Sequence, residues 1–164
     1  MFRGHFQHTI DPKGRLSIPA KFREAMGTLG EQWTDKLVIV PVDDCLEVHP
    51  LPLWEEIAAR VSAMSEFDQD VEDYQRFYTS RALDVGIDPQ GRVQIPPDYR
   101  ERVGLTKNVV IMGLTKRFEV WDTERWAGHE RARGVPIGQI RARLASKARL
   151  LEPPGPGLVP RTFG

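Results

Sequence analysis

The sequence predicts a mixed α+β fold, mostly β with peripheral helices, in which two similar halves share one core. A fifteen-residue segment occurs twice, at residues 10–24 and, 77 positions later, at residues 87–101, with nine identical positions. Each copy contains an Asp-Pro-x-Gly turn, and apolar residues alternate with others on either side of it, as in strands. Further along, Trp54 aligns with Trp126. Self-similarity of this kind indicates a duplicated supersecondary unit.

Each copy of the turn is expected to join two strands into a hairpin. Asp11 and Asp88 can accept hydrogen bonds from backbone N–H groups two residues on, and Gly14 and Gly91 can supply the positive φ that closes the turn. The two expected hairpins are Phe6–Ile10 with Arg15–Ile18, and Val85–Ile87 with Arg92–Ile95. A proline after each hairpin should end the strand and open a short helix, at Ala20–Met26 and Pro97–Val103.

A second hairpin follows in each half. The expected pairs are Lys36–Val42 with Leu46–His49, and Val109–Leu114 with Arg117–Trp121. Four short strands and one small helix cannot cover their own apolar face. We therefore expect the two halves to close on each other as one small β-barrel or sandwich, with further helices outside it.

The chain divides into five expected segments: a first repeat at 1–52, a helical connector at 53–81, a second repeat at 82–122, C-terminal helices at 123–151 and a flexible tail at 152–164. The expected helices are Leu53–Met64, about 66–81, Thr123–Arg133 and Ile137–Leu151. Ser65 and Asp68 form a capping signal for the second of these. Two apolar stripes are expected. The one in the connector is backed by acidic residues and consists of Phe67, Val71, Tyr74 and Tyr78. The one in the last helix is expected to be buried, opposite the arginines, and consists of Ile137, Ile140, Leu144, Ala148 and Leu151.

Composition limits the class of protein. The 164 residues include 23 basic and 23 acidic side chains, so the formal net charge is zero. No apolar run approaches the roughly 20 residues that a membrane span needs, and no signal peptide is visible. The single cysteine, Cys45, excludes an internal disulfide and fits a reducing cytoplasm. His5 and His8 would lie on opposite faces of a strand, so no metal site is expected.

Charge is nevertheless segregated along the chain. Residues 1–26 carry a net charge of +3, residues 66–73 carry five acidic side chains and no basic one, and residues 125–149 carry seven basic side chains against one acidic. Local fields rather than the total charge decide where a polyanion binds. A small protein with separate cationic and anionic surfaces is therefore compatible with nucleic-acid binding.

The candidate binding residues are the arginines that follow each turn glycine, Arg15 and Arg92. A guanidinium at the mouth of a turn can contact phosphates or base edges with two parallel hydrogen bonds, and a two-stranded ribbon fits the major groove. Lys13 and Arg3 add positive charge to the first copy. The alternative is that each arginine only forms an ion pair with the aspartate of its own turn, and the spacing alone does not separate the two interpretations.

Several motifs resemble the MraZ family. They are Met1-Phe2-Arg3-Gly4, Asp11-Pro12-Lys13-Gly14-Arg15, Pro50-Leu51-Pro52-Leu53-Trp54, Gly104-Leu105-Thr106-Lys107 and Phe118-Glu119-Val120-Trp121-Asp122. The resemblance implies two tandem AbrB-like swapped-hairpin units that close one small barrel and assemble into ring-shaped homo-oligomers. It implies a nucleoid-associated transcriptional regulator, with repression as the expected effect.

The DNA that the resemblance implies consists of promoter direct repeats of the division and cell-wall gene cluster, including the protein's own gene. Carried over by position, Arg15 and Arg92 become the DNA contacts, with Arg3 and Lys13 in support. Gln90 departs from the basic residue of the first turn, which puts an equal role for the second copy in question.

Three other functions are weighed. An oligomeric protein-interaction or scaffold module would use the arginine turns for subunit ion pairs without binding DNA. An enzyme is not expected, because no convergent acid, base, nucleophile or metal set is visible, and neither a cofactor nor a small-molecule substrate is expected. An antitoxin role, known for other AbrB-like proteins, is disfavoured by the tandem architecture.

Overall fold

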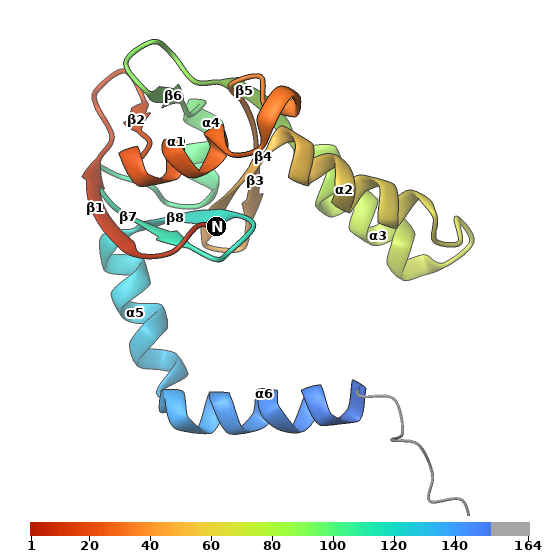
Figure 1. Ribbon diagram of the computed structural model, residues 1–164. Coiled ribbons are helices and arrows are strands. Elements are labelled where there is room, and N and C mark those ends of the chain that lie inside the picture. Colours follow the sequence, from red (N-terminus) through yellow and green to blue (C-terminus); the bar gives the residue numbers. More distant parts are fainter. Residues whose placement is uncertain (152–164) are drawn as a thin grey trace, which may run out of the picture. The chain divides into compact units, whose positions relative to one another are not determined.

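The computed structural model describes residues 1–151, and the expected tail at 152–164 lies outside the described residues. Two compact units are present, one from Met1 to Gly128 and one that begins at His129. The first unit contains all the strands (Figure 1). The expected α+β class is confirmed.

Six antiparallel strands form the main sheet in the order β1-β7-β8-β4-β3-β5. They are β1 (His5–Thr9), β3 (Lys36–Val42), β4 (Cys45–Pro50), β5 (Leu83–Gly86), β7 (Asn108–Gly113) and β8 (Phe118–Asp122). Strands β2 (Arg15–Ser17) and β6 (Arg92–Gln94) form a separate two-stranded ribbon. The expected hairpins β3–β4 and β7–β8 are confirmed, with small shifts at some strand ends.

The expected pairing of the strands that flank each Asp-Pro-x-Gly turn is wrong. Strand β1 pairs with β7 of the other half, β5 pairs with β3, and β2 pairs with β6. Within the first half, only an isolated bridge joins Ile10 to Leu16. The physical reason is that Leu16 and Val93 face each other across the ribbon and are both buried, which neither half could achieve alone. The two halves therefore exchange strands.

The sheet is open, so the expected closed barrel is not found among the described strands. Its outer strands, β1 and β5, each have one neighbour, and neither pairs with the other. The open sheet nevertheless shares a single core with the ribbon.

The core takes large side chains from both halves. Three phenylalanines, Phe2, Phe22 and Phe118, meet with ring centroids 5.0–5.3 Å apart. Around them lie aliphatic side chains of both repeats: Leu16, Ile18, Leu37, Ile39, Leu46, Val93, Ile95 and Ile111. Full burial of each such side chain contributes about 1.5–3 kcal/mol. Neither half is a separate folding core, because each provides only part of this cluster.

Each half also contributes helices to the fold. The two that follow the ribbon strands are α1 (Ala20–Gly27) and α4 (Pro97–Arg102), and both begin after a proline as expected. The others are α2 (Leu51–Ser62), α3 (Gln69–Phe77), α5 (Thr123–Arg133) and α6 (Ile137–Leu151), with 3₁₀ turns η1 (Gly30–Gln32) and η2 (Thr79–Arg81). The bounds expected for the last two helices are confirmed. Among the described residues, none of these helices is both long and apolar enough to span a membrane.

Both connector helices differ from expectation. Helix α2 begins and ends two residues before the expected Leu53–Met64, and the second helix differs more. Asp68, not Ser65, is the N-cap of α3, and its carboxylate accepts the Asp70 N–H at 2.8 Å. The helix therefore starts three residues later than expected, and Phe67 falls outside it with 92% of its surface exposed. Val71 of the same expected stripe is buried. The helix also ends earlier than expected, at Phe77, so Tyr78 is its C-cap. The expected stripe is therefore wrong at Phe67, and only Val71 and Tyr74 of it lie within the helix.

Candidate nucleic-acid interface

The two Asp-Pro-x-Gly turns have the same internal hydrogen bonds. In the first, Oδ1 of Asp11 accepts the backbone N–H groups of Lys13 and Arg15, each at 2.9 Å, and the Gly14 N–H donates to the Asp11 carbonyl at 2.9 Å. In the second, Oδ1 of Asp88 accepts the N–H groups of Gln90 and Arg92, each at 2.9 Å. Aspartate at this position therefore closes the turn, as the sequence predicts.

The second carboxylate oxygen holds the arginine. Arg15 donates from Nε to Oδ2 of Asp11 at 2.6 Å, and Arg92 donates from Nε to Oδ2 of Asp88 at 2.9 Å. Because Nε is engaged, each guanidinium is held in one orientation. Both Nη groups of Arg15 remain to meet another ligand, whereas one Nη group of Arg92 donates to Oε1 of Gln90 at 3.4 Å. Both turns therefore contain the ion pair that the spacing allows, and this pair leaves room for a contact between the guanidinium and a further ligand.

The ion pairs keep both carboxylates charged. The hydrogen bond from the Arg15 backbone N–H, reinforced by the Arg15 guanidinium, lowers the pKa of Asp11 below its usual value. The corresponding hydrogen bonds from Arg92 lower the pKa of Asp88. A lowered carboxyl pKa stabilises the turn above the ordinary pKa and loses this effect as pH falls through the lowered value. The turns are thus formed with charged aspartates at neutral pH.

The β2–β6 ribbon places the two arginines on one face. Arg15 lies opposite Gln94 and Ser17 lies opposite Arg92, while Leu16 and Val93 between them point into the core. Diagonal neighbours of this kind are about 7–8 Å apart across a ribbon. The side chains of Arg15 and Arg92 are 32% and 28% exposed. Neither guanidinium is locked inside the core, so both are accessible to a polyanion.

Each turn is completed by the other repeat. The Ile95 N–H donates to the Gly14 carbonyl at 2.9 Å, and the Ile18 N–H donates to the Gly91 carbonyl at 2.9 Å. Both glycines have positive φ, +82° at Gly14 and +77° at Gly91. A Cβ at Gly14 would lie 2.9 Å from the Ile95 carbonyl oxygen. Glycine is therefore needed both for the turn and for the close approach of the neighbouring strand.

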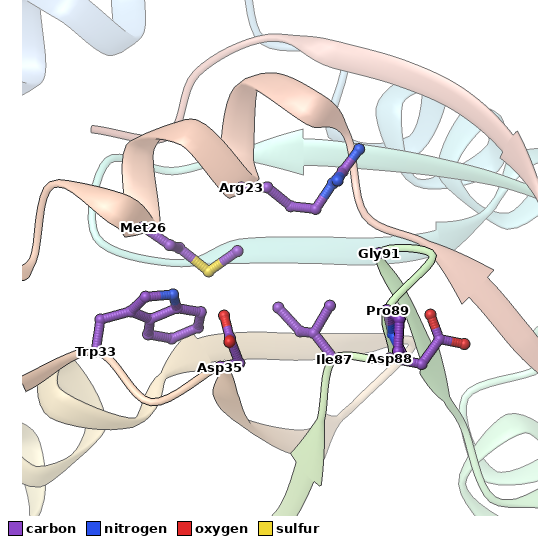
Figure 2. A pocket seen from close by; sticks show the side chains of 8 residues that line it. All are labelled: Arg23, Met26, Trp33, Asp35, Ile87, Asp88, Pro89 and Gly91. Atoms are coloured by element: carbon purple, nitrogen blue, oxygen red, sulfur yellow. The ribbon is translucent and has the colours of Figure 1, made fainter.

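Sequence reasoning missed a second pair of arginines, Arg23 on α1 and Arg100 on α4. Each donates from Nε to a backbone carbonyl of its own repeat, Arg23 to Ile18 at 3.3 Å and Arg100 to Ile95 at 3.2 Å. Each also reaches the turn glycine of the other repeat. Figure 2 shows Arg23 extending above the turn that contains Asp88 and Gly91. Both arginines are among the nine identical positions of the duplicated segment, which is the signal that could have singled them out.

A shallow cavity lies beside each turn. The cavity at the second turn has a volume of about 400 Å³, and its lining includes Arg23, Asp35 and Asp88 (Figure 2). The one at the first turn has a volume of about 330 Å³, and its lining includes Arg100, Lys107 and Asp11. The two cavities lie at equivalent places in the two repeats but differ in charge, because Lys107 lines the first where Asp35 lines the second.

Lys13 and Arg3 occupy different places. Lys13 is exposed in the first turn, next to Arg15, and its carbonyl accepts the side-chain amide of Gln94 across the ribbon. Arg3 is exposed but precedes β1, at the end remote from the turn, where Phe2 bridges to Thr115. The five residues of β1 span about 16 Å. The structure therefore joins Lys13 to the turn arginines and does not bring Arg3 to them.

A buried polar cluster lies on the other side of the sheet and is satisfied within the protein. Tyr78 donates from its hydroxyl to Oε2 of Glu47 at 2.6 Å, and Nε2 of His49 lies 3.1 Å from the same oxygen. Burial opposes ionisation of Glu47, but the hydrogen bonds from His49 and Tyr78 outweigh it and lower the pKa of Glu47. Burial likewise raises the pKa of the nearby Cys45 thiol. These groups tie β4 to the end of the connector, and no group of three or more potential metal ligands is found among residues 1–151.

The sequence matches a family model described as "MraZ protein, putative antitoxin-like" over residues 1–77 and 79–144. The chain belongs to the MraZ family. It is 36% identical over 146 residues to the transcriptional regulator MraZ of Acetivibrio thermocellus, which covers 88% of this chain and 97% of that relative. The resemblance found in the motifs is therefore confirmed.

Two further relatives carry the same name. The transcriptional regulator MraZ of Pelotomaculum thermopropionicum is 39% identical over 127 residues, which is 77% of this chain and 83% of that relative. The one of Halothermothrix orenii is 38% identical over 130 residues, which is 79% of this chain and 86% of that relative. Membership of the MraZ family supports a role as a transcriptional regulator.

Proposed function

We propose that this MraZ-family chain regulates transcription by binding double-stranded DNA in a sequence-specific manner through the β2–β6 ribbon. The observation that carries the proposal is the orientation of the two turn arginines. Arg15 and Arg92 are each held through Nε by an aspartate, and they lie on the outer face of one ribbon. A fixed guanidinium loses little conformational freedom when it binds, so its remaining donors can contact DNA at low entropic cost.

The ribbon would lie in the major groove, which admits a two-stranded β-ribbon. There, the Nη groups of Arg15 can bind a phosphate or the O6 and N7 atoms of a guanine. Lys13 and Lys107, both exposed near the first turn, are placed to contact flanking phosphates. Positive charge surrounding the first turn supplies affinity, and the arginines supply orientation and base contact.

The proposal includes self-assembly. A single ribbon has few cationic side chains and should bind weakly, whereas several ribbons in a fixed array gain about 10²–10⁴ through effective concentration. A ring of copies would suit promoter direct repeats. Following the family resemblance, we propose that these repeats precede the division and cell-wall gene cluster, including the chain's own gene. Binding there would repress transcription, and the protein would be cytoplasmic and nucleoid-associated.

Arg15→Ala should weaken binding to a promoter fragment with direct repeats by about 10–100-fold, because one charge-assisted contact contributes about 1.5–3 kcal/mol. It should also make the log-log dependence of affinity on salt shallower by about 0.9 for each phosphate that the complex no longer neutralises. Affinity would be measured by mobility shift or fluorescence anisotropy at several salt concentrations. The matched control is Arg60→Ala, which removes an exposed arginine of α2, outside the ribbon.

The scaffold alternative has one supporting observation, since both turn arginines already have ionic partners within the chain. It predicts that Arg15→Ala changes the molar mass of the assembly and leaves DNA affinity as it was. Light scattering after size exclusion, carried out on the same samples, separates the two functions. Equal DNA affinity of Arg15→Ala, Arg60→Ala and the unmodified chain would contradict the DNA-binding proposal.

A further inference from the structure

The connector helices enclose an apolar groove with an acidic border. Helices α2 and α3 run side by side (Figure 1), and a cavity of about 360 Å³ between them is lined by Val61, Met64, Val71 and Tyr74. Asp68 and Asp70 also line it. Met64 is 57% exposed. An open apolar groove with carboxylates at its edge is suited to an amphipathic helix that carries positive charge.

The acidic character continues around the groove. Residues 66–73 contain five acidic side chains, Glu66, Asp68, Asp70, Glu72 and Asp73, and no basic one. Arg76 pairs with two of them, Glu72 at 2.6 Å and Asp73 at 3.1 Å. Asp68 and Asp70, at the groove itself, have no ion pair among the described residues. Phe67, 92% exposed, adds apolar surface beside them.

Helix α6 has the complementary pattern. Ile137, Ile140 and Leu144 are 69%, 41% and 65% exposed, so these three members of the apolar stripe that was expected to be buried are uncovered. The helix contains four basic residues and no acidic one. Arg141 follows Ile137 by one turn and Lys147 follows Leu144 by three residues, so these two cations border the stripe. From the sequence, the arginines are expected to lie opposite it. The result is an apolar stripe with positive edges.

We propose that the α2–α3 groove of one copy binds helix α6 of a second copy. The inference rests on the self-assembly in the proposed function and names the two surfaces that produce it. Apolar side chains of α6 would enter the groove beside Met64, and Arg141 and Lys147 would meet the carboxylates of Asp68 and Asp70. Burial removes two exposed apolar surfaces from water, and opposite charges set the orientation.

The choice of a second copy follows from charge and geometry. The groove and the helix are different surfaces of the same chain, so their contact is heterologous. Each copy offers one helix and accepts another, and such contacts produce a ring when the rotation between copies closes. A nucleic acid is excluded from the groove by its carboxylates. The acidic connector lies outside the ribbon. In this proposal, it and the basic terminal helix together form the contact between copies.

The test is the molar mass of the full chain by light scattering after size exclusion. Leu144→Asp on the helix and Met64→Asp in the groove should each weaken self-association at least tenfold and give single chains at low micromolar concentration. Both positions are exposed, so folding should persist, and circular dichroism checks this. The matched controls are Ala142→Asp and Ala63→Asp, exposed residues outside the stripe and outside the groove lining, which should keep the mass of the unmodified assembly.

Mixing the two defective variants distinguishes a second copy from the chain's own helix. Leu144→Asp keeps an intact groove and Met64→Asp keeps an intact helix, so the mixture should form a species of two chains and nothing larger. A mixture that stays monomeric would overturn the proposal, because the intact groove of one variant and the intact helix of the other should bind each other. So would unmodified protein that is monomeric, or variants that retain the full assembly.

Failure here is separable from failure of the DNA-binding proposal. Both variants leave the β2–β6 ribbon intact, so a fragment with a single box should bind them as it binds the unmodified chain. Binding to a fragment with several boxes should fall at least tenfold, because the gain from effective concentration disappears. Equal binding of the variants and the unmodified chain to the fragment with several boxes would count against assembly through this contact.

Discussion

The first and second turns have the same backbone and different surroundings. Both carry an aspartate that accepts two N–H groups and holds an arginine through Nε. Around the first turn lie Lys13 and Lys107, whereas Gln90 and Asp35 occupy the equivalent places around the second. The duplication has thus preserved the geometry of the turn but not the charges of the residues around it.

The arginines themselves also differ in freedom. An Nη group of Arg92 donates to Oε1 of Gln90 at 3.4 Å, while among residues 1–151 no side chain beyond Asp11 holds the guanidinium of Arg15. Arg15 therefore presents more unused donors in a more positive environment. The comparison teaches that a repeated motif can build a symmetric ribbon whose two tips contribute unequally, and we infer that the first tip makes the stronger DNA contact.

The largest difference should appear in stability when each turn glycine is replaced by alanine. At Gly14 the added Cβ meets the Ile95 carbonyl oxygen at 2.9 Å, a backbone atom that cannot move away, whereas at Gly91 it meets the end of the flexible Arg23 side chain. Left-handed backbone alone costs a non-glycine residue about 1–2 kcal/mol. We expect a loss of about 3 kcal/mol for Gly14→Ala and about 1–2 kcal/mol for Gly91→Ala in denaturant unfolding. Equal losses would contradict this account of the close approach.

A smaller effect should follow when the orienting carboxylates are neutralised. Asn in place of Asp11 can still accept the backbone N–H groups, but it no longer attracts the guanidinium. Asp11→Asn should therefore weaken DNA binding about 3–10-fold even though it makes the chain more positive, and Asp88→Asn should weaken it less. Titration by fluorescence anisotropy measures both.

An effect of net charge alone would act in the opposite direction, towards tighter DNA binding, and a second charge-removing variant serves as the control. Glu24→Gln removes an exposed negative charge from α1 without touching a turn. If binding depended on charge alone, both Asp11→Asn and Glu24→Gln would bind DNA more tightly. Tighter binding by Asp11→Asn would sink the idea that the aspartate positions the arginine.

The smallest expected effect comes from exchanging the residues before the turn glycines. Lys13→Gln should make the log-log salt slope shallower by about 0.9 for each ribbon engaged, and Gln90→Lys should make it steeper if the second tip approaches a phosphate. The slope would be measured between about 50 and 200 mM salt. No change with Gln90→Lys would show that the second tip faces away from the DNA backbone.

Local signals predicted the elements well. The Asp-Pro-x-Gly turns, the β3–β4 and β7–β8 hairpins and the bounds of α5 and α6 follow from short-range chemistry, and the structure confirms them. The turn arginines could also be singled out from the sequence, because their position after each glycine is a local property, and their contact with DNA stays a prediction. Arg23 and Arg100 were missed, since their importance comes from reaching the turn of the other repeat.

Strand pairing could not be predicted in the same way. The flanks of each turn have the alternation of a hairpin, yet β1 and β5 pair across the halves. Alternation fixes which face of a strand is apolar and does not identify the neighbouring strand. Leu16 and Val93 become buried only when β2 meets β6, so the gain from burial decided the exchange.

By itself, the order of residues determined that this protein has two matching halves, each with a tight turn that ends in a cationic side chain. Turns, helix caps and apolar periodicity depend on residues close together in the sequence, so they can be predicted without knowing which distant segments pack against them. Tertiary structure decided which strands pair across the halves, that both arginines emerge on one ribbon face, and that Lys107 lies beside the first turn where Asp35 lies beside the second. Those outcomes depend on which distant surfaces bury each other, and this is a property of the whole core.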